Sequence, residues 1–106
     1  MIAAARERLP NRRASTTFAF ACGPHRYTAT VDYFPGTNKL AEIFLSNGRA
    51  GSDIDAAAID SGVVASIALQ HGIPVDVIRR ALLQDSRGVA NGPLGVAIDI
   101  ALAVLP

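Results

Sequence analysis

The chain has 106 residues, of which half are hydrophobic, and its ten basic and nine acidic side chains leave a formal net charge of +1. A chain of this length forms one domain with a small core. The single cysteine, Cys22, cannot form an internal disulfide, and no apolar run reaches the roughly 18 residues that a transmembrane helix needs. We therefore expect a cytoplasmic protein with no membrane contact, no metal site and no cofactor.

The positive charge is concentrated at the start of the chain. Four arginines against one glutamate give residues 1–13 a charge of +3. We treat these residues as a basic N-terminal arm and residues 14–106 as the folded domain. Such an arm can bind nucleic acid through its phosphates, or it can be a solvated terminus. Four arginines are few against the roughly six to ten phosphate contacts of strongly salt-dependent binding, which favours the solvated terminus.

Three segments in the first half of the chain are typical of β-strands, the first two because their side chains alternate with a period of two and the third because of its apolar residues Ile43, Phe44 and Leu45. They are residues 16–22, 25–34 and 41–46. The turn-forming pair Gly23 and Pro24 separates the first two. A Pro-Gly-Thr-Asn turn follows the second strand. The short connections favour an antiparallel meander.

After the strands, the spacing of apolar residues changes to nearly four, which is typical of helices. The predicted helices span residues 53–71, 74–83 and 94–104. The first has apolar stripes on more than one side, so we expect it to be buried against the sheet and against something else. The order predicts an α+β domain, a three-stranded antiparallel meander followed by three helices packed on one face.

The strongest candidate for a ligand site is the loop between the third strand and the first helix. Backbone N–H groups at a helix N-terminus often bind phosphate, which makes Gly48, Arg49, Gly51 and Ser52 candidate ligand-binding residues. The alternative is that Ser52 caps the helix, with Asp55 three residues later as in a capping box. Acidic residues in the first turn would repel an anion, and the loop lacks the lysine of a P-loop. We therefore favour the capping interpretation.

Two aspartates interrupt otherwise apolar helices. Asp60 lies in the first predicted helix and Asp99 in the last. A carboxylate in such a position is either at the exposed edge of the helix or paired with a counter-charge, for which Arg79 and Arg80 are the nearest candidates. The sequence leaves both interpretations open.

Several segments together resemble the TSCPD domain family. They are Arg8-Leu9-Pro10, Ala41-Glu42-Ile43-Phe44-Leu45, Gly51-Ser52-Asp53 and Ser66-Ile67-Ala68-Leu69-Gln70-His71-Gly72-Ile73-Pro74. In this family the domain occurs at the C-terminal end of some adenosylcobalamin-dependent (class II) ribonucleotide reductases and as short free-standing proteins. The resemblance covers about residues 6–102. The Thr-Ser-Cys-Pro-Asp motif that names the family is replaced by Gly-Pro-Leu-Gly-Val at 92–96, so the resemblance implies the family's fold without its thiol.

The resemblance implies a relation to the reductases without their activity. Their radical-forming barrel, cobalamin site and catalytic cysteines lie outside the similar segment, so a ribonucleoside-diphosphate reductase label would be inherited from the longer family members. We expect a free-standing, non-catalytic accessory or assembly domain and assign no catalytic residue. The alternative is a small nucleotide-binding protein or enzyme that uses the Gly48 to Ser52 loop with Arg49.

We also expect the chain to self-associate as a dimer or tetramer. The helices at 53–71 and 94–104 are largely apolar. Their apolar surface is larger than three short strands and one short helix can cover. The alternative is that these helices cover each other within one chain. A larger protein partner in nucleotide metabolism is a further expectation. The candidate interface residues on the first helix are Ala57, Ser61, Val64 and Ala65.

Overall fold

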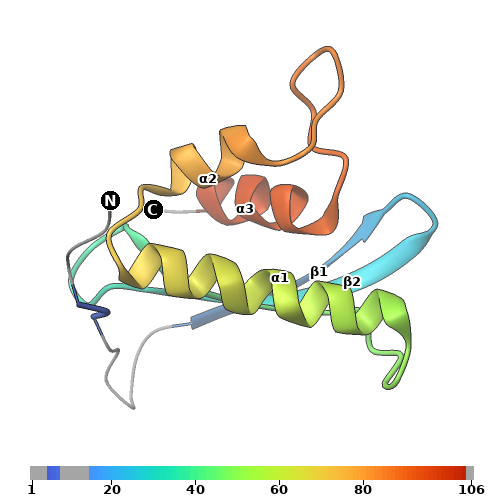
Figure 1. Ribbon diagram of the computed structural model, residues 1–106, viewed down its shortest axis with the longest axis horizontal. Coiled ribbons are helices and arrows are strands. Elements are labelled where there is room, and N and C mark those ends of the chain that lie inside the picture. Colours follow the sequence, from blue (N-terminus) through green and yellow to red (C-terminus); the bar gives the residue numbers. More distant parts are fainter. Residues whose placement is uncertain (1–4, 8–14, 105–106) are drawn as a thin grey trace.

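The computed structural model describes residues 5–7 and 15–104 and has a three-stranded antiparallel sheet followed by three helices (Figure 1). The order along the sheet is that of a meander, with the second strand in the middle. The predicted α+β class and order of elements are confirmed. The strands are β1 (Ser15–Cys22), β2 (His25–Tyr33) and β3 (Leu40–Ser46), and the helices are α1 (Asp53–Gln70), α2 (Val75–Ala81) and α3 (Pro93–Ala103).

The first two strands form a tight hairpin. Cys22 lies opposite His25, and Gly23 between them has a φ of 59°, a left-handed conformation that glycine adopts without strain. The alternation in β2 predicts a solvent-facing row of polar side chains at every second position. Arg26 at the start of that row is exposed, but Asp32 at its end is buried. The solvent-facing row therefore does not extend along the whole strand.

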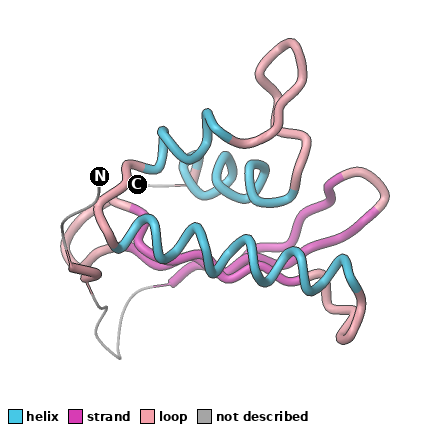
Figure 2. The backbone as a smooth tube through the Cα atoms, viewed as in Figure 1, coloured by secondary structure: helices cyan, strands magenta, loops and turns pink. Residues whose placement is uncertain are grey.

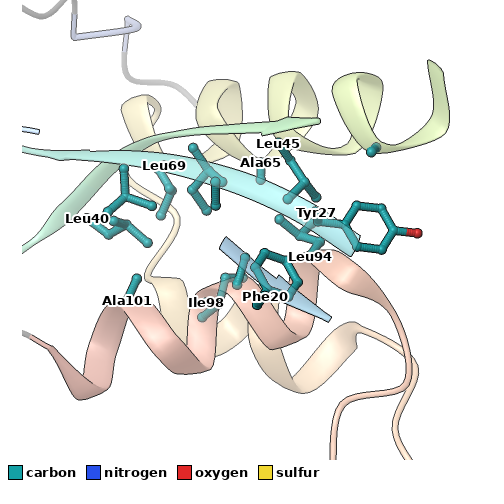
Figure 3. Close-up of a cluster of buried hydrophobic side chains, with 14 residues drawn as sticks. Phe20, Tyr27, Leu40, Leu45, Ala65, Leu69, Leu94, Ile98 and Ala101 are labelled. Atoms are coloured by element: carbon teal, nitrogen blue, oxygen red, sulfur yellow. The ribbon is translucent and has the colours of Figure 1, made fainter. Parts of the chain in front are cut away.

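The core lies on one face of the sheet and is covered by two helices (Figure 3). Ala65 of α1 lies close to Leu45 of β3 and Leu69 lies further along the same helix, while Ile98 and Ala101 of α3 lie on the opposite side of the cluster. Helix α2 contains no buried residue and contacts α3, so it forms an outer element instead of packing directly on the sheet. None of the helices in the described residues is long and apolar enough to cross a membrane.

Helix α1 packs on the core side of the sheet, and it also covers the outer edge of β3. The Oγ of Ser66 accepts a hydrogen bond from the Ile43 N–H (2.9 Å) and donates one to the Ile43 carbonyl (3.1 Å). The Gln70 Nε2 donates to the Ala41 carbonyl at 3.0 Å. Figure 2 shows the helix running alongside the strands. The edge of β3 is therefore satisfied by side chains where a further strand would otherwise pair.

The spacing of these contacts follows from the geometry of the two elements. Gly62, Ser66 and Gln70 are four residues apart and lie in one row on the helix. Four helical residues rise about 6 Å, and two strand residues rise about 6.8 Å, so each step of four along α1 matches a step of two along β3. Gly62 permits the close approach, because a Cβ at this position would lie 2.8 Å from the Ile43 carbonyl oxygen.

The opposite side of α1 has no cover within the described chain. We expected this helix to be buried on more than one side, but Val64 is 66% exposed and Val63 is 47% exposed. Ile59 and Ile67 are also exposed, one turn to either side of Val63. We call these four exposed residues the outer stripe.

An arginine–aspartate pair fixes α2 to α3. The guanidinium of Arg79 donates two hydrogen bonds to the Asp99 carboxylate, at 2.7 and 2.9 Å. It also donates to Gln84 Oε1 and the Gly88 carbonyl, in the loop that projects from the molecule between the two helices (Figure 1). Asp99 is thus both partly exposed and paired, whereas Asp60 is simply exposed.

The part of the basic arm that the structure describes contacts the end of α1. The Arg6 Nε donates to Gln70 Oε1 at 2.7 Å, and the Glu7 amide donates to the Gln70 carbonyl at 2.8 Å. The other residues of the arm lie outside the described ranges. Gln70 therefore connects β3, α1 and the start of the chain.

The close approach at Gly62 predicts an unusual sign for a helix substitution. Replacing glycine by alanine inside a helix ordinarily stabilises it by about 1 kcal/mol. Here the new methyl group would press on the Ile43 carbonyl, so we expect Gly62→Ala to lower the free energy of unfolding by about 1 to 3 kcal/mol. Urea unfolding measures the change. Asp60→Ala, at an exposed position of the same helix, is the control, and stabilisation by Gly62→Ala would contradict the contact.

Candidate functional site

The loop between β3 and α1 directs two of its backbone amides at Asp55. The Asp55 Oδ1 accepts hydrogen bonds from the Asn47 amide (2.8 Å), the Gly48 amide (3.2 Å) and the Ser46 hydroxyl (2.9 Å). A phosphate at this loop would need such amides as donors. They are engaged by a carboxylate of the same chain, so the loop is already closed around an internal anion.

The buried position of Asp55 is stabilised in its charged form. Its side chain is almost inaccessible, yet the hydrogen bonds from Asn47, Ser46 and Gly48 hold the pKa of its carboxyl below the usual value. The amide of Asn47 contributes most. Asp55 is therefore an ionised structural group that ties the end of β3 to the first turn of α1.

The predicted helix cap at Ser52 is present. Its Oγ accepts a hydrogen bond from the Asp55 amide at 3.1 Å, and its own hydroxyl donates to the Arg49 carbonyl at 2.7 Å. Only half of the capping box forms, because the Asp55 carboxylate turns to the loop and not to the Ser52 amide. The side chain of Ser52 is thus committed to capping.

The other candidate ligand residues lie on the surface of the loop. Gly48 and Gly51 have φ values of 84° and 83°, so both serve the turn, and a Cβ on either would meet no atom within 4 Å. Arg49 is exposed. The structure therefore brings the four residues into one short loop, which lines neither of the two hollows described below. Their role in binding a ligand remains a prediction.

The candidate interface residues are divided between two environments. Val64 is the most exposed member of the outer stripe, and Ala57 is also exposed. Ser61 is half-buried and donates to the Ala58 carbonyl of its own helix. Ala65 is 3% exposed and belongs to the core, so its side chain is used within the chain. The buried small residues of α1 allow the helix to pack closely against β3.

The segment that replaces the Thr-Ser-Cys-Pro-Asp motif has a packing role. Gly92 is the N-cap of α3, Pro93 begins the helix, and Leu94 is buried in the core (Figure 3). A Cβ on Gly95 would lie 2.8 Å from the Ala90 Cβ. The thiol of Cys22 lies nearby and donates to the Asn91 carbonyl at 3.5 Å.

An apolar groove of about 380 Å³ lies between α1 and the segment that leads into α3. Its walls include Ala57 and Ser61 on one side and Leu83 and Pro93 on the other. A larger hollow of about 780 Å³ lies at the other end of α1, beside Gln70, with side chains of both charge signs around it. Neither hollow contains a cluster of three metal-ligating groups, and no such cluster occurs in the described residues.

Comparison with known proteins identifies the family of the chain. Residues 4–103 match the TSCPD domain. The chain belongs to the TSCPD domain family. It is 36% identical over 73 residues to a vitamin B12-dependent ribonucleotide reductase of Rhodopirellula baltica, a match that covers 69% of this chain and 7% of that protein. It is 32% identical over 72 residues to the vitamin B12-dependent ribonucleotide reductase of Agrobacterium fabrum, covering 67% of this chain and 6% of the relative.

The TSCPD chain therefore spans only a small fraction of the curated relatives that it matches. Its relation is to a short segment of those long proteins. No solved structure matches it.

The structure shows what several residues in the segments that carry the family resemblance do. Ser66 and Gln70 come from one of these segments and bond to the backbone of another, the strand that contains Ala41 and Ile43. Ser52, from a third, caps α1. In this TSCPD domain Ser52, Ser66 and Gln70 are used to hold the fold together.

Sequence reasoning missed the roles of Asp55, Ser66 and Gln70. From the sequence, Asp55 is only a first-turn residue and a capping-box partner, and the other two are only members of a segment that resembles the family. The available signal was the row Gly62, Ser66 and Gln70, in which a small residue and two polar ones recur every four residues beside an apolar strand. Such a row is typical of a helix that lies close to backbone groups.

The environment of Asp55 predicts a pH dependence of stability. Because the folded-state pKa is below the unfolded value, the charged carboxylate stabilises the fold above about pH 4, and this contribution is lost as the pH falls through the folded pKa. We expect Asp55→Asn to lower the melting temperature at pH 7 and the difference from the unchanged chain to shrink in acid.

Thermal melts from pH 7 to 2.5 measure the effect. Asp53→Asn, an exposed aspartate in the same helical turn, is the matched control. A small acid dependence should persist in Asp55→Asn, because amide hydrogen bonds from Val89 and Arg87 also lower the pKa of Asp85. An equal difference from the unchanged chain at every pH would contradict the role of Asp55.

Proposed function

We propose that this TSCPD domain is a non-catalytic accessory or assembly domain that acts through protein–protein contact at α1. The outer stripe carries this proposal, because four branched apolar side chains are exposed on the longest helix, three of them at a spacing of four residues and Val64 beside them. A contiguous apolar surface of this kind is typical of an interaction site. The occupant that we propose is the same surface of a second copy, since two-fold association is the commonest way for a soluble chain to bury such a surface.

The chemistry of the relatives is not part of this proposal. The vitamin B12-dependent ribonucleotide reductases are more than ten times longer than the matched segment, and this chain contains one cysteine. A dithiol that reduces a substrate needs two. The loop at Gly48 and Arg49 also supports an assembly role more than nucleotide binding, because two of its amides bond to Asp55.

Self-association through the outer stripe predicts the effect of one added charge. Val64→Glu places carboxylates in the contact, so we expect it to lower the molar mass found by sedimentation equilibrium at tens of micromolar while the circular dichroism spectrum is unchanged. Val77→Glu, at an exposed valine of α2, is the matched control and should leave the mass unchanged. A mass of 11.1 kDa for the unchanged chain would contradict the proposal.

The nucleotide-binding alternative is tested by thermal shift. A ligand that binds only the folded chain raises its melting temperature with concentration. We expect ribonucleoside and deoxyribonucleoside triphosphates at millimolar concentration to leave it unchanged. A concentration-dependent rise that Arg49→Ala removes would instead assign the loop to a nucleotide.

A further inference from the structure

The two edges of the sheet differ in how the chain covers them. The outer edge of β3 bonds to Ser66 and Gln70 of α1. Along β1, by contrast, no described residue outside β2 makes a backbone hydrogen bond to the strand between Ser15 and Cys22. Within the described part of the chain, the sheet is therefore sealed on one side and open on the other.

The register identifies which backbone groups of β1 point outward. Ile43 directs its N–H and C=O to Ser66, away from β2, so Val31 opposite it directs its own groups toward β1, where it pairs with Thr16. Residues of an antiparallel pair alternate between hydrogen-bonded and non-hydrogen-bonded positions. The alternate residues, whose backbone groups point outward along the open edge, are Ser15, Thr17, Ala19 and Ala21.

This edge lacks the features that keep edge strands single. Natural sheets protect their edges with charged side chains, proline, bulges or a covering element. The eight residues of β1 are Ser-Thr-Thr-Phe-Ala-Phe-Ala-Cys, with no proline and no charged side chain, and their pairing with β2 is regular throughout. A regular, uncharged edge of this length is suited to pairing with another strand.

We propose that β1 pairs antiparallel with β1 of a second copy of this chain, about a two-fold axis at Ala19, to form a continuous six-stranded sheet. The strand is complementary to itself, because two copies bring no like charges together and each outward N–H meets an outward C=O. The inference deepens the proposed self-association, but it uses a surface on the far side of β2 from α1.

The aromatic side chains favour this register. With Ala19 opposite its own copy, Phe18 lies across from Phe20 of the second copy on the helix-covered face of the sheet. Phe18 is only partly buried in one chain, and its ring lies 6.0 Å from that of Phe20. Pairing in this register extends the row of rings across the two-fold axis and covers Phe18.

A charge at the axis tests the pairing. In the Val64→Glu background, which removes the α1 contact, we expect a mass of twice 11.1 kDa by sedimentation equilibrium. Adding Ala19→Lys places two ammonium groups directly opposite each other and should reduce the mass to that of one chain. Adding Thr28→Lys is the matched control, because Thr28 is exposed on the same face and pairs with Ala19 from the middle strand. It should leave the two-copy mass unchanged.

Disulfide formation gives a second measurement that does not depend on weakening the contact. In a Cys22→Ser background, Ala19→Cys should form a disulfide-linked dimer, because facing residues of a hydrogen-bonded antiparallel pair lie about 5.5 Å apart at Cα. Thr28→Cys should not, since the middle strands of the two copies would be separated by about 14 Å.

The outcomes separate this inference from the proposed function. If Val64→Glu already gives 11.1 kDa, or if Ala19→Cys and Thr28→Cys cross-link equally, the β1 pairing is overturned while the α1 contact stands. If Val64→Glu leaves the mass of the unchanged chain and Ala19→Lys alone reduces it, the β1 pairing stands and the α1 contact is overturned.

Discussion

A strand at the edge of a sheet needs partners for the N–H and C=O groups that face outward, and in this domain a helix provides them. Ser66 bonds to both backbone groups of Ile43, and Gln70 bonds to the carbonyl of Ala41. The arrangement depends on Gly62, which lets the helix lie against the strand, and on the near equality of four helical and two strand steps. Because α1 is fixed in this way, the position of its other side is fixed too.

The same constraint explains how the surfaces of the domain are divided. The polar residues of α1 that face the strand are used internally, and Asp55 occupies the amides of the preceding loop. Among the described surfaces that other molecules can reach are the apolar outer stripe of α1 and the open edge of β1. Both surfaces are suited to protein–protein contact, which is consistent with a TSCPD domain that works by assembly.

The sequence predicted the elements well because each has a local signal. Alternation identified the first two strands, the apolar run at residues 43–45 identified the third, and Ser52 marked the start of α1. The bonds of Ser66 and Asp55 were not predictable in this way, because their backbone partners lie 23 and about eight residues away and depend on how α1 packs on β3. The burial of Ala65 and exposure of Val64 were likewise set by which side of the helix faces the strand.

The sealing of the β3 edge is tested most directly by amide hydrogen exchange. The Ile43 N–H points away from the sheet, so without the Ser66 hydroxyl it would have no backbone partner to protect it. We expect this amide to exchange as slowly as the amides between β2 and β3, and to exchange much faster in Ser66→Ala, with Ser61→Ala as the control. Rapid exchange of Ile43 in the unchanged chain would contradict the account.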